Sequence, residues 1–216
     1  MTTRSPTTSK ADPRRRATLL DAALTVFARY GYRKASMDEI ARVAGVSRQG
    51  LYLNFADKED LFRASVQHHY ASALSAVTAS LLDKDRPIDE RLVAAFDEWL
   101  GRYVGIMGAD ASELIADTTK LTGSIMSDHR KRFEQALTKA ITDSPLKSAY
   151  AATGLTALQL ARTLDATARG IKEVSASREE FVERLVIGVR VLYASVPIGA
   201  SSSKESLHSR NARGSQ

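Results

Sequence analysis

The apolar residues of this chain recur at intervals of three and four positions, the spacing of one face of an α-helix. The pattern is clear near the N-terminus and again in the apolar face of residues 181–193. The sequence lacks sustained alternation of apolar and polar residues, and it lacks the Asn-Gly and Asp-Gly pairs of tight hairpins. It therefore predicts an all-α fold.

Capping residues divide this pattern into about nine helices. Three segments have the capping-box form Ser/Thr-x-x-Glu/Gln, and they start at Ser36, Thr156 and Ser177. Asp57, followed by acidic residues, predicts the start of a long helix that ends near Leu82. The expected set is completed by a first helix that stops at Gly31 and by helices over 90–104, 112–121, 124–143, 156–174 and 177–195, with a connection at 145–154.

Residues 36–55 are expected to form two short helices joined by a turn that contains Gly45. This is the helix-turn-helix arrangement, in which Leu51 would hold the second helix against the first. One face of residues 47–54 then projects outward. Arginine can pair with guanine and Gln or Asn with adenine in the major groove, while tyrosine can reach a phosphate or a thymine methyl group. The side chains on that face are Arg48, Gln49, Tyr52 and Asn54.

These residues and their neighbours resemble the N-terminal domain of the TetR/AcrR family of transcriptional repressors. The resemblance extends from Arg14 to Tyr70, about a quarter of the chain. Its elements occur in order and at the family's spacing: Phe27-Ala28-Arg29-Tyr30-Gly31-Tyr32, Asp38-Glu39-Ile40-Ala41, Ala44-Gly45-Val46-Ser47, Leu51-Tyr52, Phe55 and Asp57-Lys58-Glu59.

The resemblance implies roles for individual residues. It implies phosphate contacts at Ser36, Tyr52 and Lys58, and base contacts at the start of the second helix. The DNA-binding residues expected in this way are Ser36, Ser47, Arg48, Gln49, Gly50, Tyr52, Asn54 and Lys58. Two alternatives stay open, because Tyr52 could only pack against the first helix and Arg48 could contact phosphate rather than a base. Gln49-Gly50, Leu53 and Asn54 depart from the family's common residues, which leaves the operator sequence open.

The resemblance also implies a DNA-binding domain over 13–72 and a larger helical ligand-sensing and dimerisation domain over 73–196. Aromatic and Met side chains at helical spacing are more often core than pocket. The ligand-binding candidates are Phe96, Trp99, Tyr103, Met107, Met126, His129, Phe133 and Tyr150. The last two helices carry wide apolar faces that could pair with a second copy, and a C-terminal helix that is only well buried within the subunit stays open as the alternative. The dimer-interface candidates are Leu160, Leu164, Ala168, Ile171, Phe181, Leu185, Val189 and Leu192.

The positive charge of the chain is concentrated at its ends. The formal net charge is +6. Residues 1–16 hold five basic residues and one acidic one, and residues 197–216 hold three and one, so the two tails account for all of it. A basic arm suits a polyanion such as DNA, although it also suits plain solubility. Residues 1–12 and 197–216 are expected to be disordered.

Composition excludes several classes of protein. With 44% hydrophobic and 26% charged residues the chain can bury a core. It has no cysteine, which excludes disulfide scaffolds, thiolate metal sites and cysteine nucleophiles. The N-terminus lacks the apolar stretch of a signal peptide, and no segment is apolar enough to span a bilayer. We expect a cytoplasmic protein, associated with the nucleoid when bound to DNA.

Enzyme chemistry has little support in the sequence. There are four histidines, and none belongs to a His-Glu-x-x-His motif. We expect no catalytic residues, no metal and no cofactor. The resemblance implies a sequence-specific DNA-binding transcriptional regulator, a homodimeric repressor that a small molecule releases from double-stranded operator DNA. Activation stays open, because the sign of regulation depends on where the operator lies. Two other functions stay open: a helical adaptor indifferent to Tyr52→Ala, and a non-specific DNA-binding protein that depends on residues 1–16.

Overall fold

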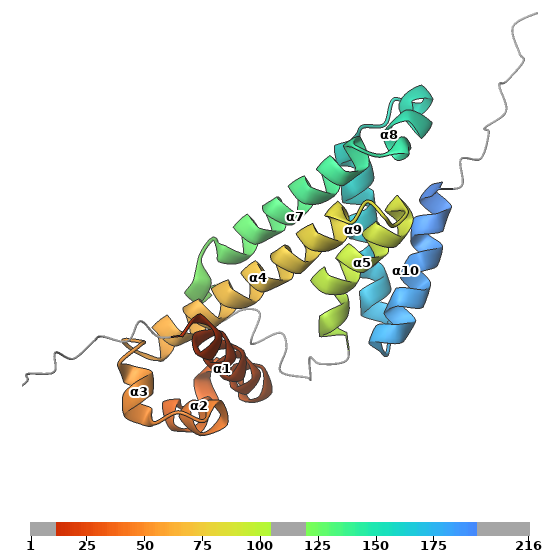
Figure 1. Ribbon diagram of the computed structural model, residues 1–216. Coiled ribbons are helices and arrows are strands. Elements are labelled where there is room, and N and C mark those ends of the chain that lie inside the picture. The colour runs from red at the N-terminus through yellow and green to blue at the C-terminus, as the bar shows by residue number, and fades with distance from the viewer. Residues whose placement is uncertain (1–11, 105–119, 194–216) are drawn as a thin grey trace, which may run out of the picture.

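The computed structural model describes residues 12–104 and 120–193, and within these ranges every regular element is helical. The prediction of an all-α fold with about nine helices is confirmed. The helices are α1 (Pro13–Lys34), α2 (Met37–Ala44), α3 (Arg48–Tyr52), α4 (Lys58–Leu82), α5 (Ile88–Trp99), α7 (Ile125–Thr142), α8 (Pro145–Ala149), α9 (Ala157–Val174) and α10 (Arg178–Tyr193), with short 3-10 turns at Gly101–Tyr103 and Ala151–Thr153 (Figure 1).

The long helix α4 joins two bodies (Figure 1). Its first turns complete a small core with α1, α2 and α3, to which it contributes Leu61, Phe62 and Val66. Its later turns belong to a second core built with α5, α7, α8, α9 and α10. Tyr70, between these two stretches, packs against both cores. A movement of α4 would therefore change the packing in both bodies.

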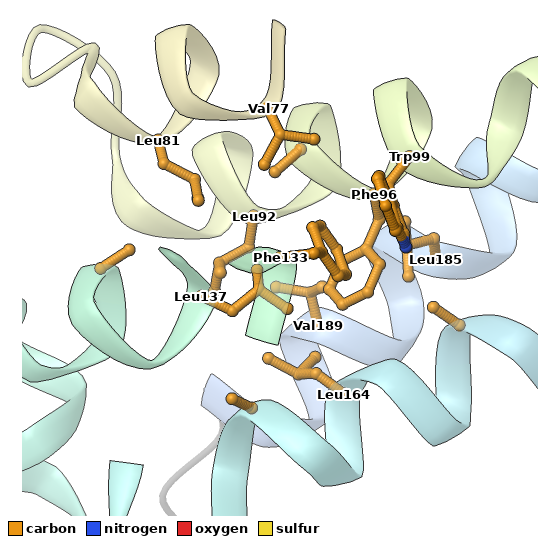
Figure 2. Packing of buried hydrophobic residues seen from close by; sticks show 14 of the residues in the cluster. Val77, Leu81, Leu92, Phe96, Trp99, Phe133, Leu137, Leu164, Leu185 and Val189 are labelled. Atoms are coloured by element: carbon orange, nitrogen blue, oxygen red, sulfur yellow. The ribbon is translucent and has the colours of Figure 1, made fainter. Parts of the chain in front are cut away.

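The second core is dominated by aromatic and branched aliphatic side chains. Figure 2 shows labelled residues of α4, α5, α7, α9 and α10 pointing toward one another. Trp99 stacks on Phe133 with ring centroids 4.6 Å apart, and Phe96 meets Phe133 edge-on at 5.3 Å. Aromatic pairs in these geometries contribute about 0.5–1.5 kcal/mol beyond the area that they bury.

Three predicted helix ends differ from the structure. Gly31 does interrupt α1, since its φ of 75° is open to glycine alone among common residues, but a last turn continues to Lys34. The helix expected over 90–104 ends at Trp99, and buried Gly101 follows in a 3-10 turn where a side chain would collide with Asp97. The connection expected at 145–154 contains α8, which starts at Pro145.

The three predicted capping boxes form in three different ways. The box of Thr156 and Gln159 is complete. Ser36 accepts from the Glu39 amide, but the Glu39 side chain turns to Arg42 instead of returning to Ser36. Ser177 accepts from the amide of Glu180, whose carboxylate reaches the amide of residue 176.

Several expectations fall outside the described residues. They are the tails 1–11 and 197–216, Met107, and all but the end of the helix expected over 112–121. Asp12, which we expected at the end of a disordered arm, instead caps α1 by accepting from the Arg14 amide at 3.0 Å. The domain boundary expected between residues 72 and 73 falls on α4, between its contributions to the two cores.

Candidate nucleic-acid interface

The pair α2–α3 is held by a tight turn and a small core. Gly45 has a φ of 67°, and its amide donates back to the carbonyl oxygens of Ala41 and Arg42, which ends α2. Ile40, Ala41 and Leu51 are buried where the two helices cross. This fixes α3 on α2 and leaves the opposite side of α3 to solvent.

Two serines stand at the N-terminal ends of the pair. Ser36 caps α2 and Ser47 caps α3, where its Oγ accepts from the Gly50 amide at 3.0 Å. Both residues are exposed. A Cβ at Gly50 would come within 3.1 Å of the Ser47 Oγ, so the glycine leaves room for the cap. The contribution of Ser36 as a structural cap is thus visible, while its phosphate contact stays a prediction.

The reading face of α3 is exposed, as expected. Gln49 is exposed, and Tyr52 keeps 44% of its surface open to solvent. The packing role that we had left open for Tyr52 therefore accounts for only part of this side chain. Asn54 is exposed, and its Nδ2 donates to the Gly50 carbonyl at 2.8 Å, so its amide is oriented by the end of α3.

Arg48 projects from the first turn of α3 and is held from two sides. Its Nη1 donates to Asp38 Oδ2 at 2.9 Å, and its guanidinium lies 5.7 Å from the centre of the Tyr52 ring. Asp38 was not among the predicted site residues, because it lies ten positions before Arg48 and the two side chains meet only across the turn between α2 and α3. Leu53, whose exposed fraction is 80%, was predicted only to depart from the residues common in the family, with no role in the site.

Lys58 lies at the junction of α1 and α4. Its Nζ is 3.0, 3.3 and 3.2 Å from the carbonyl oxygens of Tyr32, Arg33 and Ala35, and 4.6 Å from the centre of the Tyr32 ring. An ammonium group has three N–H donors, so three acceptors can use all of them. The phosphate contact expected for Lys58 would require this group to leave the end of α1.

The three arginines that directly precede the first core belong to α1. Arg14, Arg15 and Arg16 are exposed in its first turn. The Arg16 guanidinium lies over the ring of buried Phe55, 4.8 Å from its centre. This contact places positive charge beside the start of α4, close to the end of α3.

The first body of the chain, built from α1 to the start of α4, is similar to a known family. Residues 19–65 match the model of the family described as bacterial regulatory proteins, tetR family. The N-terminal body of the chain is thus similar to the DNA-binding domain of the TetR family. The matched residues include α2, α3 and every buried residue that joins them.

Two curated relatives are similar to the same TetR-family domain. The chain is 46% identical over 67 residues to the HTH-type transcriptional activator FasR of Mycolicibacterium smegmatis, which covers 31% of each chain. It is 48% identical over 44 residues to the HTH-type transcriptional regulator AcrR of Shigella flexneri, which covers 20% of each chain. The alignments thus span a third or less of these relatives.

The fold extends the likeness beyond the first domain. The fatty acid degradation regulator FadR from Bacillus halodurans has a solved structure that superposes with a TM-score of 0.61 at 18% identity, over 84% of this chain and 96% of that one. Reduced NemR from Escherichia coli superposes with a TM-score of 0.61 at 19% identity, over 82% and 96%. At these identities the likeness shows a shared fold.

The ligand-binding candidates are distributed over the second body. Phe96, Trp99 and Phe133 form the aromatic stack of its core, and buried His129 tilts against Tyr70 with centroids 5.7 Å apart. Met126, Tyr103 and Tyr150 are half-buried, and the Tyr150 hydroxyl donates to the Leu192 carbonyl at the end of α10. Trp99 and His129 thus pack against Tyr70, at the junction of the cores, with ring centroids 5.8 and 5.7 Å from its own, and Tyr150 lies elsewhere.

Tyr103 approaches His69 of α4 from the turn after α5, and its hydroxyl is hydrogen-bonded to His69 Nε2. The pKa of His69 is lowered to about 4, first by burial and then by the charge of Arg102, with His68 adding to the effect and Asp21 opposing it. Burial raises the pKa of the Tyr103 hydroxyl, which therefore keeps its proton. At neutral pH the pair is uncharged.

This shift predicts a pH-dependent stability. In the unfolded chain His69 titrates near pH 6.5. Between pH 6.5 and about 4 the unfolded chain therefore holds a proton that the folded chain does not, so the stability is fully present above pH 6.5 and falls as the pH is lowered through this window. His69→Gln should flatten that fall, as measured by urea denaturation at pH 7.5 and 5. An equal fall in both proteins would contradict the assignment.

The dimer-interface candidates are placed differently from our expectation. Six of them are buried within the single subunit, each exposing 5% of its surface or less: Leu160, Leu164, Ala168, Phe181, Leu185 and Val189. A second copy cannot reach these side chains, because they form the core between α9, α10 and α5. Ile171 and Leu192 are half-buried. The apolar faces that we read as an interface therefore hold the subunit together.

The opposite side of α9 and α10 carries exposed apolar residues. Ile187 and Val191, one turn apart on α10, expose 63% and 68% of their surfaces, and Val174 at the end of α9 exposes 63%. Gly188 packs against Thr167 and Ile171, which brings the two helices close together. Single exposed apolar residues are ordinary, but Ile187 and Val191 lie together on the side of α10 away from its buried residues Phe181, Leu185 and Val189.

A shallow groove of about 470 Å³ lies between α7 and α9 and is lined mainly by polar side chains, Glu134, Thr138 and Lys139 among them. None of the eight ligand-binding candidates lines it. Within the described ranges no group of three His, Asp or Glu side chains is placed to hold a metal ion. None of the helices in those ranges is both long and apolar enough to cross a membrane.

Proposed function

We propose that this protein is a sequence-specific DNA-binding transcriptional regulator. The observation that carries the proposal is the exposed face of α3, where Arg48, Gln49 and Tyr52 stand on a helix-turn-helix that matches the TetR family. A single helix turned outward with donors for guanine and adenine suits the major groove. A catalytic step forms no part of the proposal. A protein that binds the chromosome works where the chromosome is, in the cytoplasm and on the nucleoid.

We further propose that it acts as a homodimer joined through the outer faces of α9 and α10. Ile187 and Val191 would supply the apolar centre of this interface. Two recognition helices about one turn of B-DNA apart, roughly 34 Å, then bind two half-sites. The symmetry of the protein implies an operator with (pseudo)palindromic halves.

The proposed regulation is release from the operator by a small molecule in the second body. The supporting observation is Tyr70, which packs against both cores on the helix that they share. A molecule that favours another arrangement around Tyr70, Trp99 and His129 would tilt α4 and change the spacing of the recognition helices. Repression is our first proposal for the outcome. Activation is the second, because the relative FasR is named an activator.

Fluorescence anisotropy on the intergenic duplexes beside the gene, with excess random duplex present, tests the function. We expect binding that survives the competitor and weakens steeply with salt. Each phosphate contact contributes about −0.9 to the slope of log K against the logarithm of the salt concentration. Tyr52→Ala should weaken this binding. Binding removed by the competitor would favour the non-specific alternative. No salt-dependent binding to any duplex, with or without Tyr52→Ala, would favour an adaptor.

A further inference from the structure

An acidic side chain lies on the reading face although it belongs to the preceding helix. Asp38, in the first turn of α2, forms an ion pair with Arg48 in which the two side chains expose 62% and 61% of their surfaces. The ring of Tyr52 lies on another side of the same guanidinium. A carboxylate at this place repels phosphates of any DNA sequence, which makes its presence on a DNA-binding surface informative.

We propose that Asp38 is a specificity-determining positioning residue, which fixes Arg48 so that its remaining donors meet a base edge. The inference rests on the proposed function and deepens it. A guanidinium carries five N–H donors in a planar fork, and the bond to Asp38 occupies only one side of that fork. A freely moving arginine would contact phosphates as readily as bases, and phosphate contacts carry no sequence information. The ion pair thus lowers the affinity for DNA of any sequence and raises the discrimination between the operator and other sequences.

The pair can be removed without unfolding the domain. Ion pairs between exposed side chains contribute little to stability, because water screens the charges and two flexible side chains must be ordered. Asp38 is not buried, and the cap of α2 is provided by Ser36. Asp38→Asn keeps the shape of the side chain and loses its charge. Its effect should therefore appear in DNA binding rather than in folding.

The chain offers a matched control in the next residue. Glu39 lies in the same turn of α2 and forms an ion pair at 2.6 Å, but its partner is Arg42, which has no predicted contact with DNA. Glu39→Gln removes the same negative charge from almost the same place. Any effect of charge alone should be common to both variants.

The experiment measures anisotropy with two probes, a duplex recovered by in vitro selection with the wild-type protein and a random duplex of equal length. For Asp38→Asn we expect weaker binding to the selected duplex and stronger binding to the random one, so that their affinity ratio falls about tenfold, the low end for one arginine–guanine contact. For Glu39→Gln both affinities should rise together and leave the ratio unchanged. In an Arg48→Ala background, Asp38→Asn should change the ratio by less than about twofold.

Two results would overturn the inference while the proposed function stands. One is an equal rise on both probes with Asp38→Asn, as for the control, which would make Asp38 a general repulsive charge. The other is an undiminished fall of the affinity ratio when Asp38→Asn is made in the Arg48→Ala background, which would show that Asp38 does not act through Arg48. A wild-type protein that fails to prefer the selected duplex would overturn the proposed function, and the inference with it.

Discussion

Replacing Ile187 by arginine is expected to convert the dimer into a monomer and to weaken operator binding by at least about a hundredfold. Ile187 lies on the outer face of α10 and is 63% exposed in the single subunit, so the larger side chain fits the isolated fold. In the dimer it would place two uncompensated charges near the symmetry axis, and their desolvation opposes association. A monomer binds only one half-site and loses the increase in affinity that comes from linking two recognition helices.

Sedimentation velocity gives the oligomeric state of this variant, and anisotropy on the selected duplex gives its affinity. Leu82→Arg is the matched control, because Leu82 has the same exposed fraction of 63% but lies at the end of α4, a helix outside the proposed interface. We expect the control to remain a dimer with wild-type affinity. A dimeric Ile187→Arg would place the interface elsewhere on the subunit.

Replacing Lys58 by methionine is expected to destabilise the first domain by about 2 kcal/mol. The ammonium group faces three carbonyl oxygens at the end of α1, where the helix dipole also favours a cation. Methionine keeps most of the apolar stem and removes the donors, which leaves these carbonyls without their charged partner. Urea denaturation followed by circular dichroism measures the loss, and faster amide exchange in α1 assigns it to this domain.

The same variant decides between the two roles of Lys58. If its ammonium group acts as a clamp on α1, the slope of log K against log salt for a random duplex should be unchanged. If it contacts a phosphate, the slope should fall by about 0.9 for each subunit. Lys34→Met, at an exposed position in the last turn of α1, should change stability by less than about 0.5 kcal/mol. Unchanged stability of Lys58→Met with a reduced slope would contradict the clamp.

The features that were predictable from sequence are those set by near neighbours. The caps at Ser36, Ser47 and Thr156 depend on residues three positions away, and the structure contains all three. The period of the apolar residues predicted the all-α fold and the exposed face of α3, because this period also depends on residues three and four positions apart. Gly45 ends α2 because its left-handed conformation is local.

The features that were not predictable depend on contacts between distant segments. Lys58 bonds to residues more than twenty positions earlier, and Asp38 meets Arg48 across a turn. From sequence alone, the apolar stripe of α10 fits a dimer interface and a subunit core equally well. Only the positions of the neighbouring helices distinguish the two. Phe181 and Leu185 face α5 and α9, and this leaves Ile187 and Val191 to the surface.

In vitro selection from a pool of random duplexes tests the central claim most directly. The wild-type protein should enrich one motif with two inverted half-sites about one helical turn apart, roughly 10 base pairs between their centres. That result would establish a dimeric reader of DNA sequence. A pool that stays random after repeated rounds, although the protein retains DNA at low salt, would contradict sequence-specific binding and leave only an electrostatic affinity.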